Sequence, residues 1–266
     1  MDITNRFKAR ILDRNAAAPL GTWLMAAAPA TAEALGYAGF DFLVVDMEHV
    51  PIEMSDLAAI LRAIGCTPAQ AVVRLAWNDQ VLVKRALDAG AQTIMLPFVQ
   101  SADEARAATA FAHYPPEGVR GVAAVHRGSR FGQVRDYFAQ ANRQVCTIVQ
   151  LETPQALANL GEIAAVPGID ALFVGPGDLS ASMGHIGNIA HPEVQAALAR
   201  AAKDCATLNK PVGIVGANPE MVARFLDYGY SFAAVSSDIA LMTGRASEWL
   251  ASLRSPGPVA TPAAAY

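Results

Sequence analysis

Two carboxylates that follow apolar runs are the residues most suggestive of chemistry. Glu152 ends the run Val145–Glu152, and Asp178 ends the run Ala171–Asp178. As consecutive parallel strands these runs would lie roughly 4.8 Å apart, so the two carboxylates could meet. Ionised carboxylates this close repel and need a shared proton or a cation between them. Such a pair suits oxygen-preferring Mg²⁺ or Mn²⁺. We therefore predict a divalent-metal site; the alternative is that each carboxylate caps the helix that follows it.

A histidine close to a third carboxylate could transfer protons at this site. His49 follows the run Phe40–Asp46, and Pro51 stops the strand from continuing. A histidine with a reference pKa of about 6.5, oriented by Asp46, is suited to proton transfer at neutral pH. A positioned base contributes ~10²–10⁴-fold in rate. The other histidines lack acidic company and are interpreted as loop or cap residues: His113, His126, His185 and His191.

An arginine follows the third apolar run. Arg74 lies at the end of Val72-Val73-Arg74, where a charge without a partner would be costly to bury. A substrate carboxylate or a developing enolate oxygen could supply the anion. A structural pair with Asp46, Glu48 or Asp79 is equally compatible with the spacing, and both interpretations stay open.

The positions of the lysines bear on how a carbanion could be stabilised. The chain has four, and none ends an expected strand: Lys8, Lys84, Lys203 and Lys210. A Schiff base is therefore not expected at the carboxyl ends of the strands. If the site stabilises a carbanion beside a carbonyl, we expect a metal to act as the electrophile.

Strand-like and helix-like segments alternate along the chain. We expect eight strands, at Leu20–Met25, Phe40–Asp46, Ala71–Ala76, Thr93–Val99, Val145–Glu152, Ala171–Asp178, Val212–Ala217 and Phe232–Asp238. Helical spacing occurs between them, at Ile52–Ile64, Asp79–Ala89, Ala102–Ala112, Pro154–Ala164, Pro192–Leu208 and Pro219–Tyr228. This alternation predicts an α/β fold, a (β/α)8 TIM barrel with its site at the carboxyl ends of the strands. An open doubly wound sheet is the competitor, but its GxGxxG fingerprint is absent.

The segments between and beyond these elements carry further signals. We expect residues 1–254 to form one barrel domain and residues 255–266, rich in Pro and Ala, to be a flexible tail. The polar segment His113–Asn142 is predicted to be a loop on the active-site side. Glycines after four apolar stretches are expected in the left-handed conformation that ends helices: Gly39, Gly65, Gly90 and Gly229.

Composition excludes several classes of function. The net charge is −4 with no Lys/Arg-rich run, so nucleic-acid binding is not expected. No uncharged apolar stretch approaches the ~20 residues of a membrane span, and no export signal is visible. The three cysteines, Cys66, Cys146 and Cys205, have neither zinc nor disulfide spacing. We therefore expect a cytoplasmic protein with no membrane segment.

Several motifs resemble those of the HpcH/HpaI class II pyruvate aldolases, over roughly residues 21–242. The most specific are GFDFLVVDMEH, VVRLAWND, DAGAQTIMLPFVQSADEA, YPPEGVRGV, VQLETPQAL and VGPGDLSASMG. The resemblance implies a TIM barrel in which Glu152 and Asp178 hold the metal that chelates pyruvate. It implies His49 as the general base, supported by Asp46 and Asp88.

The resemblance also implies substrate contacts and points where this chain departs from the family. Arg74 matches the arginine that stabilises the enolate oxygen, while Gln150 and the backbone of Gly177 and Asp178 match substrate contacts. The family often reads DGEH where this chain has Met47, and GPADLS where it has Gly177. Variable pocket positions in such enzymes correspond to Arg127, Arg130, Phe131 and Val215.

The leading hypothesis is a metal-dependent aldolase that reversibly cleaves 4-hydroxy-2-oxo acids to pyruvate, or hydroxypyruvate, and an aldehyde. The cation would be Mg²⁺ or Mn²⁺, with Co²⁺ and Zn²⁺ as further candidates. The family resemblance implies a homo-oligomer, a hexamer built from dimers that exchange C-terminal helices. The alternatives are a CoA-thioester lyase of the malyl-CoA or citramalyl-CoA type and a non-catalytic barrel that binds oxo acids.

Overall fold

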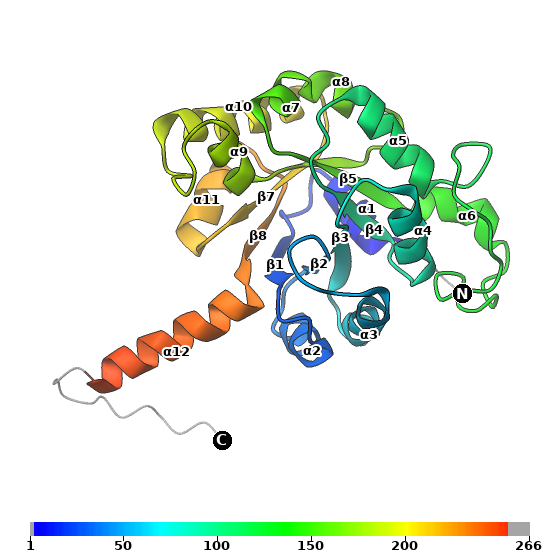
Figure 1. Cartoon of the computed structure of the whole chain (residues 1–266), viewed down its shortest axis with the longest axis horizontal. Coiled ribbons are helices and arrows are strands. Elements are labelled where there is room, and N and C mark those ends of the chain that lie inside the picture. The colour runs from blue at the N-terminus through cyan, green and yellow to red at the C-terminus, as the bar shows by residue number, and fades with distance from the viewer. Residues whose placement is uncertain (1–2, 255–266) are drawn as a thin grey trace.

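Eight short parallel strands close into a barrel in the computed structural model, which describes residues 3–254 (Figure 1). The strands are β1 (Leu20–Leu24), β2 (Phe42–Asp46), β3 (Gln70–Arg74), β4 (Thr93–Leu96), β5 (Cys146–Leu151), β6 (Ala171–Val174), β7 (Val212–Gly216) and β8 (Phe232–Ser237). Each pairs with its neighbours in sequence, and β8 pairs with β1 to close the ring. The predicted (β/α)8 barrel is confirmed, and closure excludes the open sheet.

Helices connect the strands and cover the outside of the barrel. They are α1 (Arg6–Leu12), α2 (Pro29–Tyr37), α3 (Met54–Ile64), α4 (Gln80–Asp88), α5 (Ala102–Ala112), α6 (Tyr137–Gln144), α7 (Pro154–Ala158), α8 (Leu160–Ala164), α9 (Pro176–Ser182), α10 (Pro192–Thr207), α11 (Pro219–Tyr228) and α12 (Asp238–Arg254). The single helix expected over residues 154–164 is divided at Asn159, which ends α7 and precedes α8. The six expected helical segments are otherwise present, with ends that differ by a few residues.

Aromatic side chains fill the interior of the barrel near the amino-terminal ends of the strands. Phe42 and Phe232 point inward, and Phe7 from α1 packs edge-on against both, with ring centroids 5.1 and 5.6 Å away. A Cβ at Gly213 would lie 2.2 Å from the Phe232 ring, so glycine there makes room for that ring. Helix α1 thus closes the amino-terminal end of the barrel, and the carboxyl ends of the strands are left for the site.

The segment from His113 to Asn142 lies on the opposite side from the one predicted. Helix α5 leaves the carboxyl end of β4 and runs back along the barrel, so the residues after it lie at the amino-terminal ends of the strands. Asn142 bonds both backbone groups of Tyr114 there, at 2.8 and 3.1 Å. The segment is not a plain loop either, because α6 forms within it. The prediction of an active-site-side loop within one chain is wrong.

Helix ends confirm most of the glycine signals. Gly39, Gly90 and Gly229 have φ values of 108°, 106° and 108°, in the left-handed region. Gly65 is the exception, since it continues in helical conformation with φ −64°. The predicted left-handed end at Gly65 is therefore wrong.

Helix α12 projects away from the barrel (Figure 1). Its only buried residue is Asp238 at the start, and it exposes large apolar side chains that include Met242, Trp249 and Leu253. Within residues 3–254 no helix is both long and apolar enough to cross a membrane. The predicted tail, residues 255–266, lies outside the described residues.

Candidate active site

Arg74 and Asp46 form a buried ion pair at the carboxyl ends of β2 and β3. The register of the two strands places the residues side by side. Arg74 Nε donates to Asp46 Oδ1 at 3.0 Å and Nη2 donates to Oδ2 at 2.5 Å. Trp23 at β1 donates to Asp46 Oδ2 at 3.2 Å, and the guanidinium lies 5.2 Å from the centre of the Trp23 ring. This two-point pair fixes the plane of the guanidinium and leaves Nη1 to reach a further anion.

Glu48 is that further anion within the chain. Its Oε2 lies 2.9 Å from Arg74 Nη1, and that oxygen is buried without a well-aligned hydrogen bond. Burial raises the pKa of Glu48, opposed by the charges of Arg74 and His49 and reinforced by those of Asp46 and Asp178. Of the alternatives left open for Arg74, the structure shows the pairs with Asp46 and Glu48. Arg74 is therefore an ordered arginine at the site, and the hydrogen bonds to Asp46 fix the orientation of its guanidinium.

The Asp46 carboxylate is oriented by its surroundings and does not bind the His49 ring. Its Oδ1 accepts the backbone N–H groups of Glu48 and His49, at 3.0 and 3.2 Å. Burial raises its pKa, but the hydrogen bonds and charge of Arg74 and these backbone groups outweigh burial, and the net pKa is lowered. Asp46 therefore stays ionised and folds the turn that carries His49. The prediction that this carboxylate orients the imidazole is corrected: it orients the backbone.

Glu152 is buried directly after β5, with 3% of its surface exposed. Its Oε2 accepts the backbone N–H of Phe98 at 2.9 Å, and its Oε1 accepts Gln150 Nε2 at 3.2 Å. A Cβ at Gly175 would lie 2.5 Å from Oε1, so glycine at that position admits the carboxylate. Thr153, not Glu152, caps α7 by accepting from Ala156 N. The helix-capping alternative is therefore excluded for Glu152.

The electrostatic surroundings of Glu152 lack a cation committed to it. Burial raises its pKa to about 7; the Phe98 N–H and Arg74 oppose the rise, and the charges of Asp178 and Glu48 add to it. Among the described residues no Lys, Arg or His side chain forms an ion pair with Glu152. Burying a carboxylate in this way is costly unless a proton or a cation neutralises it.

Asp178 lies in the first turn of α9, not at the end of a strand. Strand β6 ends at Val174, and Gly175 and Pro176 begin the helix. The prediction that strand six extends to Asp178 is therefore wrong, but the residue still lies at the carboxyl end of the barrel and interacts electrostatically with Glu152 and Glu48. Asp178 is exposed, and a Cβ at neighbouring Gly177 would meet no atom within 4 Å. The space beside this turn is open.

His49 is exposed on the turn after β2, and its charge acts on Glu48. Gln150 is buried on β5, and its Oε1 has no hydrogen-bond partner among the described residues. Val215 is half-buried near the carboxyl end of β7 and packs against the interior aromatic cluster. These three residues therefore share the end of the barrel with Glu152.

The donor set fits a hard divalent cation. Glu152 and Asp178 offer carboxylate oxygens, burial raises the pKa of Glu152 with a further rise from the charges of Asp178 and Glu48, and Gln150 leaves a buried carbonyl oxygen without a donor. Oxygen ligands of this kind suit Mg²⁺ or Mn²⁺. The residues present are compatible with the predicted metal.

Asp88 does not reach His49 within the chain. It ends α4, which runs back toward the amino-terminal end of β4, and its carboxylate accepts Arg120 Nη2 at 2.7 Å. Arg120 is fully buried against the Tyr114 ring, 4.3 Å from its centre. Asp88 here anchors the segment after α5. The structure shows the pair with Arg120 and no bond between Asp88 and His49 in the described residues, and the role of Asp88 that the resemblance implies stays a prediction.

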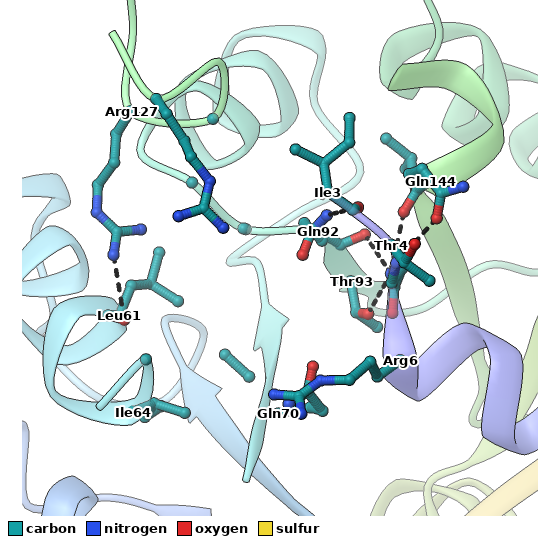
Figure 2. Close-up of a pocket in the computed structure, with 18 of the residues that line it drawn as sticks. Ile3, Thr4, Arg6, Leu61, Ile64, Gln70, Gln92, Thr93, Arg127 and Gln144 are labelled. Carbon is teal, nitrogen blue, oxygen red and sulfur yellow. Dashed lines mark hydrogen bonds between the residues drawn. The ribbon is translucent and has the colours of Figure 1, made fainter. Parts of the chain in front are cut away.

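The loop residues expected to shape the substrate pocket lie at the same amino-terminal end. Arg127, Arg130 and Phe131 line a separate cavity of about 780 Å³, with Arg6 on its other side. Figure 2 shows Arg127 bonding the backbone oxygen of Leu61, and Arg6 approaching from the first helix. Within one chain these residues cannot contact a substrate held at Glu152.

Sequence reasoning named Glu48 only as a possible partner of Arg74 and missed two other groups at the site. No polar pattern in the sequence marks the Trp23 ring or the backbone N–H of Phe98. Phe98 has φ 55°, an uncommon value for a non-glycine residue, and its N–H donates to Glu152. The left-handed backbone of Phe98 marks this donor in the structure, and the sequence carries no such signal.

Known sequences resemble this chain along most of its length. The sequence profile described as HpcH/HpaI aldolase/citrate lyase matches residues 20–244. A 2-dehydro-3,6-dideoxy-6-sulfogluconate aldolase of Pseudomonas putida is 60% identical over 237 residues, which are 89% of this chain and 93% of the relative. A 4-hydroxy-2-oxo-heptane-1,7-dioate aldolase of Shigella sonnei is 45% identical over 249 residues, 93% of this chain and 94% of the relative.

Solved structures match the fold. An HpcH/HpaI aldolase/citrate lyase family protein from Burkholderia cenocepacia superposes with a TM-score of 0.91 at 40% identity, covering 95% of this chain and 100% of that one. An HpcH/HpaI aldolase from Desulfitobacterium hafniense gives a TM-score of 0.83 at 26% identity, with 91% and 95% covered. These matches confirm the resemblance drawn from the sequence motifs.

The raised pKa of Glu152 predicts how pH affects the metal-free chain. Folded Glu152 holds its proton up to about pH 7, whereas the reference pKa is 4.5. The folded state then binds more protons inside this window, so the free energy of unfolding should fall as pH rises through it. At about 1.4 kcal/mol per pKa unit, the fall is on the order of 3 kcal/mol. Urea unfolding in EDTA at pH 5 and pH 8 measures it.

Glu152→Gln is the matched variant, because glutamine keeps an acceptor for the Phe98 N–H and cannot ionise. Its stability should fall less between the two pH values than that of the wild type. Equal pH slopes for the two proteins would show that Glu152 titrates normally.

Proposed function

We propose that this chain is a divalent-metal-dependent enzyme that reversibly cleaves 4-hydroxy-2-oxo acids to pyruvate, or hydroxypyruvate, and an aldehyde. The chain belongs to the HpcH/HpaI aldolase/citrate lyase family and is an aldolase, a carbon–carbon lyase. The supporting observation is the buried Glu152 carboxylate, with Asp178 nearby and no protein cation paired to it. Because close relatives of the chain are named aldolases, a non-catalytic barrel that binds oxo acids is no longer a competing interpretation.

The cleavage breaks the bond between C3 and C4 of the substrate. The C4 hydroxyl gives up its proton and becomes the aldehyde carbonyl. The electron pair of the broken bond moves onto C3 and the C2 oxygen as an enolate, which takes up a proton at C3 to give pyruvate. The enzyme must therefore stabilise an enolate oxygen and move one proton off and one proton on.

Glu152 and Asp178 would hold the cation, Mg²⁺ or Mn²⁺ by their oxygen ligands, with Co²⁺ and Zn²⁺ as further candidates. When bound, the cation supplies a Lewis acid for the keto acid's oxygens. Glu152 is fixed for this task by the Phe98 N–H and by Gln150. Because these groups are in place before a ligand arrives, little side-chain ordering remains when the site fills.

Arg74 is the residue that would stabilise the enolate oxygen. Its guanidinium is oriented by Asp46 through two hydrogen bonds, and Nη1 faces the side where Glu48 lies. Gln150 and the backbone N–H groups of Gly177 and Asp178 would contact the keto acid. The first turn of α9 has no side-chain cap, so its N–H groups remain open to an anion. Val215 would border the pocket from β7.

His49 would act as the general base that removes the C4 hydroxyl proton and returns it in the aldol direction. It lies on a turn held by two backbone hydrogen bonds to Asp46. Its exposure places it where an aldehyde-side hydroxyl could approach from solvent. Asp46 thus acts as a positioning residue for both Arg74 and the His49 turn.

The names of the relatives favour an anionic aldehyde. 6-Sulfogluconate and heptane-1,7-dioate both carry an anionic group at the end remote from the oxo acid. Cleavage of 2-dehydro-3,6-dideoxy-6-sulfogluconate between C3 and C4 would give pyruvate and a hydroxyaldehyde bearing a sulfonate. At 60% against 45% identity, we favour the sulfonated substrate for this chain.

We also retain two proposals about the whole molecule. Residues 1–254 form one barrel domain. The chain is a homo-oligomer, a hexamer in which C-terminal helices are exchanged; the apolar side chains exposed on the projecting α12 support an exchange of this helix.

A substrate and metal panel tests the reaction. With Mg²⁺ or Mn²⁺, the enzyme should release pyruvate from 2-dehydro-3,6-dideoxy-6-sulfogluconate faster than from 4-hydroxy-2-oxo-heptane-1,7-dioate or from analogues without a remote charge, and it should do so without CoA. Because a Lewis acid is worth several kcal/mol, EDTA should lower the rate by about 100-fold or more. Pyruvate release can be followed by coupled reduction to lactate. Full activity in EDTA, or a strict need for a CoA thioester, would contradict the proposal.

Two substitutions separate metal binding from proton transfer. Glu152→Ala should abolish both activity and metal retention after gel filtration, measured by elemental analysis. His49→Ala should lower kcat by ~10²–10⁴-fold with the metal still bound. Glu162→Ala, which truncates an exposed glutamate on α8, is the control and should change neither quantity. Metal retained by Glu152→Ala at the wild-type level would remove that residue from the site.

A further inference from the structure

Two histidines and a glutamate meet at the turn between α9 and α10. His185 Nε2 lies 3.0 Å from Glu193 Oε2, and the rings of His185 and His191 stack with centroids 3.5 Å apart and an interplanar angle of 17°. Each residue offers a ligand atom, and the three atoms all lie within 4.8 Å of one another. The two histidines are half-buried and the glutamate is exposed. None of these residues belongs to the aldolase site described above.

We propose that His185, His191 and Glu193 form a second metal site, for a borderline divalent cation of the Zn²⁺, Co²⁺ or Ni²⁺ type. Two imidazoles and one carboxylate, with a water in the fourth position, are a ligand set that Zn²⁺ accepts in tetrahedral geometry. Imidazole ligands disfavour Mg²⁺, which prefers oxygen. The site therefore differs in ligand chemistry from the carboxylates of Glu152 and Asp178.

The beginning of α10 differs from that of α11 in one informative residue. Helix α11 begins Asn218-Pro219-Glu220, and Asn218 caps it by accepting Met221 N at 2.9 Å. Helix α10 begins His191-Pro192-Glu193 instead. Histidine is a poorer cap than asparagine, and its only cap bond, from Glu193 N to Nδ1, is long at 3.3 Å. A role as N-cap therefore does not by itself explain why an imidazole occupies position 191.

Charge also favours a cation at the turn. The Glu193 carboxylate supplies a negative charge beside the two imidazoles, and the hydrogen bond from His185 and the charges of His185 and His191 lower its pKa. Two stacked imidazolium rings would repel each other, whereas two neutral rings can both ligate. Metal binding would replace the His185–Glu193 contact and the long cap bond, both of which are exposed to water and inexpensive to give up.

The two imidazole rings would turn out of their stack to point a nitrogen each at one cation, because a metal lies in the plane of every imidazole that binds it. Bonds of 2.0–2.1 Å to a tetrahedral Zn²⁺ place ligand atoms about 3.4 Å apart. In the structure the three ligand atoms lie within 4.8 Å of one another, so they would move closer together. The turn contains Gly184 and Gly187 with φ values of 83° and 75°, and the side chains are not packed in the core. An occupied site would tie this turn, which continues from the helix that carries Asp178, to the start of α10.

Zn²⁺ titration by calorimetry, in saturating Mg²⁺, tests the proposal. The wild type should bind one more Zn²⁺ per chain than the double variant His185→Gln/His191→Asn. Asparagine restores the cap found at α11, and glutamine retains a donor for Glu193, so the variant should unfold at the wild-type temperature in EDTA and keep its Mg²⁺-dependent aldolase rate. Loss of an outer partner alone costs about 10–100-fold in metal affinity, so Glu193→Gln should weaken this site at least about tenfold.

Glu220→Gln is the matched control, because Glu220 occupies the same position on α11 with no histidine beside it. It should leave Zn²⁺ binding unchanged. Histidine ring ¹⁵N resonances provide a second measurement: Zn²⁺ should shift those of His185 and His191 and spare His113. Equal Zn²⁺ stoichiometry and affinity in wild type and double variant, with no shift of those two rings, would overturn the proposal and leave the aldolase site untouched.

Discussion

Burial of one carboxylate beside other negative charges is the constraint on which the site depends. Glu152 lies under the residues that follow β4 and β6, with Phe98 donating from one side and Gly175 making room on the other. Among residues 3–254 no basic side chain forms an ion pair with Glu152, and Arg74, whose charge lowers the pKa of Glu152, is paired with Asp46 and Glu48. Burial raises the pKa of Glu152 to about 7, and the charges of Asp178 and Glu48 add to the rise. In the function proposed above, a cation bound by Glu152 and Asp178 together would neutralise this carboxylate.

The barrel makes this arrangement possible by bringing strand ends to one place. Helix α1 and the interior aromatic rings fill the amino-terminal end of the barrel interior, and the proposed site residues lie at the carboxyl ends of the strands. There the two carboxylates differ: the contacts with Arg74 and the backbone lower the pKa of Asp46, whereas the pKa of Glu152 is raised, and Glu152 is the proposed metal ligand. Asp238 contributes to closure by accepting the backbone N–H groups of Met25 and Ala26, which joins the loops after β8 and β1.

Much of the fold could be predicted because burial on both faces of parallel strands leaves a plain apolar signature. The eight runs and their alternation with amphipathic helices were sufficient for the barrel. The boundary at Asp178 failed, although Gly175-Pro176 is a typical helix start, because the apolar run before it was extended too far. The side of the barrel on which residues 113–142 lie follows from the direction of α5, and local composition carries no such information.

Site residues could be selected by type, but their partners could not. Asp46 lies three residues before His49, and that spacing suggested a carboxylate bonded to the ring; in the structure the same spacing forms a turn in which Asp46 accepts the His49 backbone. The pairing of Asp46 with Arg74 depends on the register of β2 and β3, which a sequence does not display. Asp88 shows the same limit, because its partner Arg120 is 32 residues away.

Anomalous diffraction from crystals soaked in Mn²⁺ tests the central claim most directly. The account predicts an anomalous peak within bonding distance of one Glu152 oxygen and one Asp178 oxygen, and its disappearance in crystals of a Glu152→Gln variant. A Mn²⁺ peak bound elsewhere, with Glu152 still holding only the Phe98 and Gln150 hydrogen bonds, would contradict it.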